Sequence, residues 1–246
     1  MKYMPILPIG MFHVFDRTDV RDVFILPQFW DNESYREFYT SHKWDHVIID
    51  NAMYEQLNGV PFGHLINIAD QLDADRVFIV SPEDIRNPYT TAAYAVETGD
   101  RFGFRDSNWE MMCILHGTPY DMVNQYYMLR KYPMGYGIAV SAWRSGYDRA
   151  GIFKYVGFRD KDYVHAMGWD SIIEIFALNN VGFDSIDSSI VATAAVNRIM
   201  LGPDTVIRRT GSVSDPKRVD LLQTTFSTDE TLSCVNNIHS VREYLV

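Results

Sequence analysis

Short β-branched and apolar runs alternate along this chain with longer segments whose apolar residues recur at helical spacing. A run such as Val77–Val80 predicts a buried strand, because consecutive apolar residues bounded by polar ones are typical of a strand covered on both faces. Between such runs, apolar residues three and four positions apart predict amphipathic helices, for example from Leu65 to Leu72 and from Ile172 to Ala177. The predicted strands are Val23–Leu26, Val47–Ile49, Val77–Val80, Met111–Leu115, Tyr136–Val140, Tyr163–Met167 and Phe183–Ile186, with Val206–Ile207 as an eighth candidate.

The order of these elements predicts the fold class. Strand and helix alternate over the 246 residues, and no Gly/Ser-rich linker or repeat interrupts them. Such alternation is typical of α/β proteins with parallel strands, and seven or eight strand–helix units fit a (β/α)8 barrel of the TIM type. A doubly wound open sheet is the alternative. We predict a single barrel domain over residues 1–246, with the apolar segment Met4–Gly10 covering the barrel bottom.

Composition and charge then narrow the class of protein. The chain is 47% hydrophobic and 22% charged, as in ordinary globular proteins. Two cysteines, Cys113 and Cys234, cannot build a disulfide framework or a four-cysteine zinc site. The net charge of -10 argues against a surface that coats nucleic acid broadly, but it is compatible with a local basic groove. The apolar runs are far shorter than the roughly 20 residues of a membrane span and no signal-peptide pattern opens the chain, so we expect a cytoplasmic protein without membrane contact.

Polar residues directly after the predicted strands are the first candidates for chemistry, because barrel enzymes place their active sites at the carboxyl ends of the strands. Asp50 and Asn51 follow one strand, Ser81 to Asp84 another, His116 a third, and Asp187 a fourth. An Asp or Ser in such a place is also a common cap of the next helix. Asp50 is the least cap-like of these residues, since Ala52-Met53-Tyr54 follow it instead of a turn sequence.

In their order along the chain, these residues resemble the motifs of the tRNA-guanine transglycosylase superfamily. The resemblance runs from about the second predicted strand to the seventh. The segments that carry it are Asp50-Asn51-Ala52-Met53-Tyr54 (Asp-Ser-Gly-Gly-Tyr in the family), Asp84 ahead of Pro88-Tyr89, His116-Gly117 (Gln-Gly), Gly137-Ile138-Ala139-Val140 (Gly-Leu-Ala-Val), His165-Ala166-Met167-Gly168 (Leu-Met-Gly) and Gly182-Phe183-Asp184-Ser185-Ile186-Asp187 (Gly-Ile-Asp-Met-Phe-Asp).

The resemblance implies a role for each matched residue. It makes Asp187 the catalytic nucleophile and Asp50 the general acid/base. It places Asp84 at the hydrogen-bonding edge of guanine and stacks Tyr54 and Met167 on the base. The remaining implied contacts with the base come from Asn51, His116, Gly137 and Ile138, where His116 replaces a glutamine and could alter recognition of the 7-substituent.

Two departures from the family pattern bear on whether the substrate is DNA or tRNA. The family zinc subdomain has no counterpart, because Cys234 and His239 stand alone, and Ser188-Ser189-Ile190-Val191 replace the Pro-Thr-Arg run that helps to hold tRNA. The pattern is thus most similar to the short branch of phages and bacterial DNA-modification systems, which inserts 7-deazaguanine bases into DNA. The resemblance implies DNA and a free 7-deazaguanine base as partners, no cofactor and no metal, and the host cytoplasm as the location if the gene is viral.

The residues themselves fit that chemistry. A carboxylate nucleophile can take over the sugar carbon C1′ and return it to a second base, so that two displacements preserve its configuration. A base inside a duplex must be extruded first, which requires contacts to phosphates. Candidate cations lie after the fifth predicted strand and near the carboxyl terminus, although such residues are more often solvated surface charges. They are Arg144, Arg149, Lys154, Arg208, Arg209, Lys217 and Arg218.

Three other functions are compatible with the same residues. The first is base exchange on tRNA, which uses every proposed catalytic residue. The second is a non-catalytic barrel partner subunit, although Asp50, Asp84 and Asp187 argue against it. For the transglycosylase itself, a homodimer or a partner protein of a modification system is compatible with the sequence. The third is a barrel hydrolase or lyase that acts on a small nucleoside or sugar and releases a free base.

Overall fold

The structure is a computed structural model with parallel strands and helices in alternation. It describes residues 1–53, 59–104, 106, 108–131, 137–141 (backbone), 149–160, 162–169, 171–203, 205 and 219–245. The chain divides into two compact units. The larger unit is Phe24–Met167, and the smaller one combines the two ends of the chain, Met1–Val23 and Gly168–Val246. The single domain over residues 1–246 stays a prediction.

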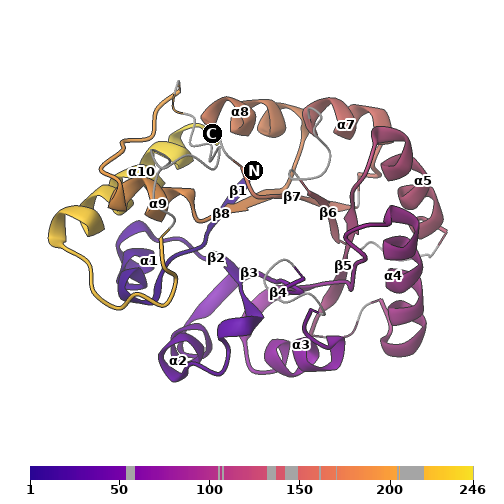
Figure 1. Cartoon of the computed structure of the whole chain (residues 1–246), viewed down its shortest axis with the longest axis horizontal. Helices are drawn as coiled ribbons and strands as arrows, with labels where there is room; N and C mark the ends of the chain where they lie inside the picture. The colour runs from indigo at the N-terminus through magenta and orange to yellow at the C-terminus, as the bar shows by residue number, and fades with distance from the viewer. Residues whose placement is uncertain are drawn as a thin grey trace. The chain divides into compact units, whose positions relative to one another are not determined.

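The larger unit holds six parallel strands in the order β2-β3-β4-β5-β6-β7. Their register places Val47 beside Val77, Phe78 beside Glu110, and Cys113 beside Ile138. The strands are β2 (Asp22–Ile25, which begins in the smaller unit), β3 (Lys43–Ile49), β4 (Asp73–Val80), β5 (Glu110–Leu115), β6 (Gly137–Ser141) and β7 (Tyr163–Met167). The helices are the 3-10 helix η2 (Pro27–Phe29), α2 (Glu33–Ser41), α3 (Phe62–Ala69), α4 (Pro88–Phe102), α5 (Pro119–Leu129) and α7 (Arg149–Val156). Figure 1 shows α3, α4, α5 and α7 on the same face of these strands.

The sheet of the larger unit is strongly curved. The ring of Phe24 in β2 stacks on His165 in β7 with 5.8 Å between ring centroids, although these strands stand at opposite ends of the six-strand order. Phe78 in β4 similarly meets Tyr163 in β7 at 4.5 Å. Side chains of strands that do not neighbour each other can touch only when the sheet curls around its concave face.

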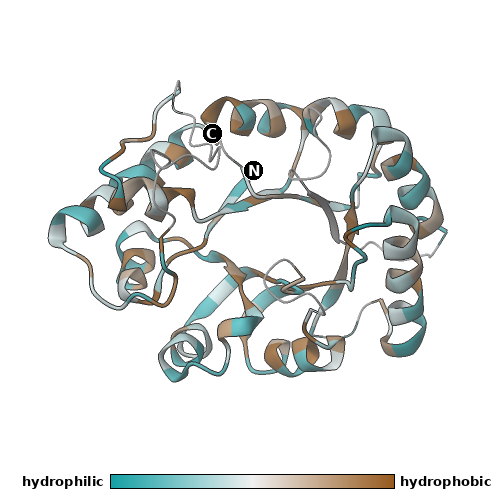
Figure 2. Ribbon diagram, in the orientation of Figure 1, coloured by the Kyte–Doolittle hydropathy of each residue, from teal (hydrophilic) through white to brown (hydrophobic). Residues whose placement is uncertain are grey.

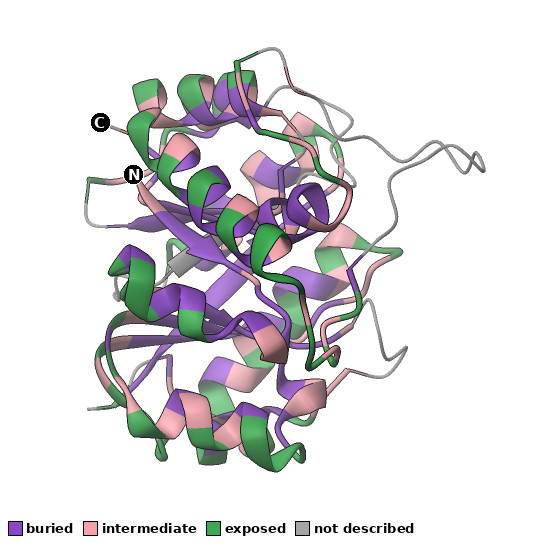
Figure 3. Cartoon of the chain, turned by 90° about the vertical axis from the view of Figure 1, so that its left-hand side faces the viewer, coloured by how far each residue is buried: buried purple, intermediate pink, exposed green. Residues whose placement is uncertain are grey.

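The core of the larger unit explains why these segments form strands. All six residues of β5 are buried, which fits its nearly continuous apolar run. The helices bury one face only. In α4, for example, Thr91, Ala92 and Ala95 are buried, whereas Tyr94 is exposed. Figure 2 shows mixed hydropathy along these helices, and Figure 3 shows buried strands beside helices that are exposed on their outer side.

The smaller unit is built on one pair of parallel strands. β1 (Lys2–Pro5) pairs with β8 (Ser185–Ser188), and the register places Met4 beside Asp187. A capping box at Ser227, in which Ser227 and Glu230 exchange hydrogen bonds, begins the last helix. The helices are the 3-10 helix η1 (Ile9–Met11), α1 (His13–Thr18), α8 (Ile172–Val181), α9 (Ile190–Val196) and α10 (Thr228–Glu243).

The seven main predicted strands are confirmed as β2 to β8, with ends that differ by a few residues. The eighth candidate, Val206–Ile207, lies outside the described residues. Met4 and Pro5, the first two residues of the segment predicted to cover the barrel bottom, belong to the strand β1; coverage of a barrel bottom stays a prediction. The α/β class with parallel strands is therefore established.

Candidate functional site

The end of β3 carries a buried carboxylate. Asp50 is 6% exposed, and its backbone N–H donates to the carbonyl of Ile25 at the end of β2. Its Oδ2 accepts the N–H of Ala52 at 3.2 Å. Ala52 has a φ of 56°, in the left-handed region that non-glycine residues rarely adopt and that is common at functional sites. This is the position at which the resembled family has glycine.

Asn51 joins the ends of two neighbouring strands. Its Nδ2 donates to the carbonyl of Ser81 at 2.8 Å, and its Oδ1 accepts the N–H of Met53 at 3.0 Å. The carbonyl of Asn51 accepts the N–H of Val60, which closes the base of the loop that follows β3. These contacts hold the Asp50 segment against the end of β4. Contact between Asn51 and a base stays a prediction.

The loop after β4 contains a second carboxylate, to which the sequence resemblance assigned no role. Glu83 is buried, with 4% of its surface exposed, whereas the predicted base-reading residue Asp84 is half-buried. Asp84 Oδ1 accepts the N–H of Arg86 at 2.9 Å, which forms a local turn. Adjacent acidic residues after a strand are equally suited to reading a base, and their sequence does not reveal which of them is buried. The burial of Glu83 makes it a second candidate.

His116 at the end of β5 is buried and contacts the loop after β4 through Thr91. The Thr91 hydroxyl lies 2.9 Å from His116 Nε2, accepts the N–H of Asp84 at 2.9 Å, and donates to the Asp84 carbonyl at 3.0 Å. The carbonyl of Asn87 lies within hydrogen-bond distance of the same hydroxyl, at 3.3 Å, so Thr91 connects His116 to the loop after β4 and to the start of α4. The carbonyl of His116 accepts Nε2 of the buried Gln125 at 2.7 Å. His116 and Asp84 are therefore brought together.

A capping box at the start of α5 links this helix to α4. The backbone N–H and hydroxyl of Thr118 donate to Asp121 Oδ2 at 2.9 and 2.7 Å, and the hydroxyl of Tyr89 donates to Oδ1 at 3.1 Å. These donors hold the pKa of Asp121 below its ordinary value, with the Thr118 hydroxyl as the largest cause. The two helices that follow β4 and β5 therefore begin at a fixed separation.

Replacing Thr118 with alanine tests this link. We expect Thr118→Ala to lower the free energy of unfolding by about 1 kcal/mol at pH 7, because one cap of α5 is lost. A carboxyl group with a lowered folded-state pKa contributes stability above its unfolded-state pKa, and that stability is lost as the pH falls through the folded-state value. The difference between variant and wild type should therefore shrink in acid. Urea unfolding at pH 7 and below pH ~4 measures it.

Ser227→Ala, at the capping box of α10, is the matched control and should show a similar loss in the smaller unit. An unchanged unfolding midpoint for Thr118→Ala would contradict the role of this cap.

The end of β7 is held by a buried arginine. Arg149, the first residue of α7, is 1% exposed and donates from Nη1 to the carbonyl of Met167 at 2.9 Å. The sequence alone suggested a solvated cation or a phosphate contact for Arg149. Its burial instead shows a role inside the protein, at a strand end that the resemblance assigns to the base pocket. Met167 itself is half-buried.

The smaller unit contains the predicted nucleophile. Asp187 is 6% exposed, and its Oδ1 accepts the N–H of Gly168 at 3.0 Å. Gly168 has a φ of 67°, which glycine adopts without strain. Asp187 lies within β8 instead of after it, because pairing with β1 extends the strand to Ser188. A buried carboxylate with one oxygen held by a backbone N–H is suited to act as a nucleophile of fixed orientation.

Other predicted residues can be placed only in part. Gly137 and Ile138 belong to β6, where Gly137 pairs with Met112 and Tyr163. Tyr54, Arg144, Arg208, Arg209, Lys217 and Arg218 lie outside the described residues.

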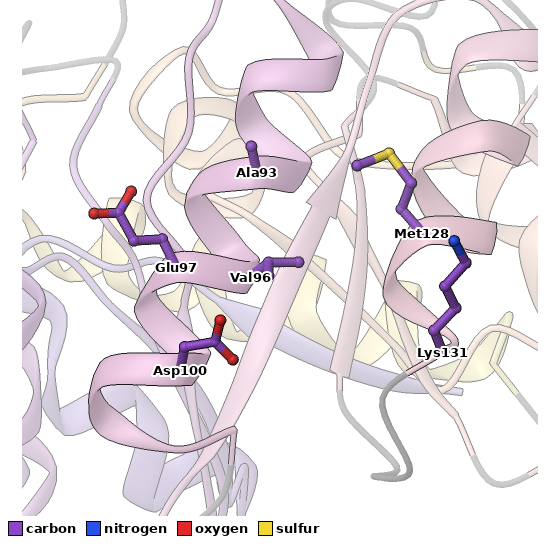
Figure 4. A pocket seen from close by; sticks show the side chains of 6 residues that line it. All are labelled: Ala93, Val96, Glu97, Asp100, Met128 and Lys131. Atoms are coloured by element: carbon purple, nitrogen blue, oxygen red, sulfur yellow. The ribbon is translucent and has the colours of Figure 1, made fainter.

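A hollow lies away from the strand ends, on the outer surface of the larger unit. It has a volume of about 430 Å³ and is formed by α4 and α5 (Figure 4). Its apolar floor includes Val96 and Met128, and Glu97, Asp100 and Lys131 provide its charges. None of the predicted site residues lines it, so the hollow is separate from the candidate site.

The described residues were also compared with the requirements for metal binding and membrane insertion, and the sequence was compared with known proteins. Among the described residues, no group of three or more His, Cys, Asp or Glu side chains could hold a metal ion. The described part of the chain also has no helix that is long and apolar enough to span a membrane. The sequence matches no protein-family model and no curated protein. The resemblance to transglycosylases therefore rests on the motifs quoted above.

Proposed function

We propose that this protein is a base-exchange transglycosylase that replaces guanine in DNA with a 7-deazaguanine base. The observation that carries the proposal is a pair of buried aspartates, Asp50 and Asp187, each 6% exposed. Each lies at the carboxyl-terminal end of a parallel strand and has one oxygen oriented by a backbone N–H. This arrangement suits an enzyme that needs one carboxylate as nucleophile and another as proton carrier.

The fold that we propose for this activity is a (β/α)8 barrel formed by the strands of both units. Two observations support it. The described strand pairs in each unit are parallel, and the sheet of the larger unit curls until Phe24 of its first strand meets His165 of its last. A barrel would gather the carboxyl ends of all strands at one mouth.

The proposed reaction consists of two displacements at C1′. An Asp187 oxygen forms a bond to C1′ while the bond between C1′ and guanine N9 breaks, and Asp50 donates a proton to the departing guanine. Asp50 then removes the N9 proton of the incoming 7-deazaguanine, N9 attacks C1′, and the Asp187 carboxylate leaves with its electron pair. Configuration at C1′ is retained and the polymer backbone stays intact.

The experiment that tests the function is incorporation of labelled guanine and labelled 7-cyano-7-deazaguanine into DNA and tRNA in parallel. We expect label in DNA and none in tRNA. Label in tRNA alone would replace the DNA assignment with tRNA base exchange. No label in either polymer, together with release of free base from nucleosides, would identify a hydrolase.

Base selection should depend on a carboxylate after β4. Guanine presents its N1–H and its 2-amino group side by side as two donors, and a carboxylate accepts both. Adenine cannot offer this pair, because its N1 is an acceptor. We expect replacement of the reading carboxylate by its amide to lower kcat/KM for guanine roughly 10- to 100-fold, the cost of losing a charge-assisted hydrogen bond. Asp84→Asn and Glu83→Gln form a matched pair for this test.

The variant with the larger loss identifies the reading residue. The sequence resemblance predicts Asp84, whereas burial favours Glu83. Steady-state exchange with guanine, using hypoxanthine as the competitor that lacks the amine, measures the effect. Equal and small losses in both variants would contradict recognition by this loop.

A further inference from the structure

The surroundings of Asp187 contain two aromatic residues that the proposed reaction does not use. Tyr3 in β1 and Trp169 are 4% and 6% exposed, and their rings meet edge to face with centroids 6.2 Å apart. Trp169 directly follows Gly168, whose N–H holds Asp187 Oδ1. The hydroxyl of Tyr3 donates to the carbonyl of Ser188 at 3.1 Å, and Ser188 directly follows Asp187.

These contacts connect Asp187 to the two aromatic residues in two ways inside the smaller unit. The Asp187 side chain accepts a hydrogen bond from Gly168, and the next residue, Trp169, contacts the ring of Tyr3. Tyr3 in turn donates to the carbonyl of Ser188, the residue after Asp187. The carboxylate is therefore supported from both sides, through its side chain and through its strand.

We infer that Tyr3 and Trp169 are positioning residues that hold Asp187 in the orientation required for attack on C1′. This inference rests on the proposed function and extends it to two residues outside the motifs of the resembled family. Nucleophilic attack depends strongly on geometry, since a displacement of about 1 Å can cost about 100-fold in rate. A carboxylate supported on one side only has more freedom to leave the line of attack.

The hydroxyl of Tyr3 is suited to a constant structural role. Burial raises the pKa of Tyr3 well above its ordinary value, and the nearby Cys234 and Asp187 raise it further. The hydroxyl therefore stays protonated and acts as a donor throughout the working range of an enzyme. Ser188 also accepts the N–H of Ile6 at 3.0 Å, so removal of the Tyr3 hydroxyl leaves no carbonyl without a donor.

Trp169 contacts Tyr3 through its ring. Nε1 is buried and has no hydrogen-bond partner among the described residues. Trp169→Phe should therefore keep the contact with Tyr3, whereas Trp169→Ala should remove it. The two variants separate the ring contact from every other property of the tryptophan.

The test is the single-turnover rate at which a covalent adduct forms between the protein and a guanine-containing DNA oligonucleotide. We expect Tyr3→Phe to slow adduct formation about 10-fold and Trp169→Ala about 100-fold. KM for the free base, measured separately in steady-state exchange, should be unchanged. Trp169→Phe should retain the wild-type rate within about twofold. Because Tyr3→Phe removes one oxygen atom only, it keeps the test decisive even if Trp169→Ala does not fold.

A matched control lies in the larger unit. Tyr126 is also a buried tyrosine, and its hydroxyl donates to Asp162 Oδ2 at 2.5 Å in a loop before β7. Tyr126→Phe should lower thermal stability without slowing adduct formation. If the wild type forms adduct and Tyr3→Phe and Trp169→Ala match its rate, the positioning role is wrong while the proposed function stands. If the wild type forms no adduct, both fall.

Discussion

Asp187→Ala should abolish base exchange and the covalent adduct, with a loss in rate of at least about 10⁴-fold, the scale seen when a nucleophile is removed from a covalent catalyst. The reason is chemical, because no other group in the proposed reaction can form the ester with C1′. Circular dichroism and thermal unfolding of Asp187→Ala show whether the variant is folded, because the substitution also removes the acceptor of the Gly168 N–H.

The control for this prediction is Asp184→Ala. Asp184 precedes β8, is half-buried, and its backbone carbonyl accepts the N–H of Lys2 at 2.7 Å, a contact that the substitution preserves. We expect near-normal exchange by Asp184→Ala. Gel separation of a labelled oligonucleotide covalently bound to protein measures both variants. Full activity of Asp187→Ala would refute the nucleophile assignment, and loss of the adduct in Asp184→Ala alone would move it to Asp184.

Asp50→Asn should lower the exchange rate by roughly 10²- to 10⁴-fold, which is the usual contribution of a general acid or base. The asparagine is nearly isosteric, and its Oδ1 can still accept the N–H of Ala52. The local structure should therefore remain, and only proton transfer should be lost. Circular dichroism and thermal unfolding close to those of the wild type would confirm that the loss is chemical.

A second test of the Asp50 prediction varies the acidity of the departing base. A base that departs without a proton needs less help, so oligonucleotides carrying a more acidic purine should lose less rate in Asp50→Asn than those carrying guanine. The ratio of the two rates should shift toward the acidic base by at least about tenfold. An unchanged ratio would indicate that Asp50 orients the substrate and does not carry the proton.

Several features could be predicted from local sequence alone. The strands β2 to β8 were found because buried parallel strands need runs of apolar residues, and such runs are visible without knowledge of the fold. The polar residues at strand ends were also found in this way, and Asp50 and His116 follow β3 and β5 as predicted. β1 was missed because Lys2, Tyr3 and Pro5 do not form an apolar run, and this strand is defined by its pairing with β8.

Other features depend on contacts between residues that are distant in sequence. The burial of Glu83 rather than Asp84 reflects the path of one loop, and the internal role of Arg149 depends on the carbonyl of Met167, 18 residues away. The same holds for Asp187, whose partner Gly168 lies 19 residues before it and whose strand is extended by the chain's first residues.

The sequence by itself determined the α/β class, the position of most strands and the residue types that gather at their ends, because apolar periodicity and strand-end polarity are local properties of a chain. Only the tertiary structure decided which of those residues are buried, which oxygen of Asp187 a backbone N–H holds, and that Tyr3 and Trp169 support it. The physical reason is that strand pairing and side-chain packing join segments that are far apart along the chain. The residues of one segment do not indicate which distant segment it will contact.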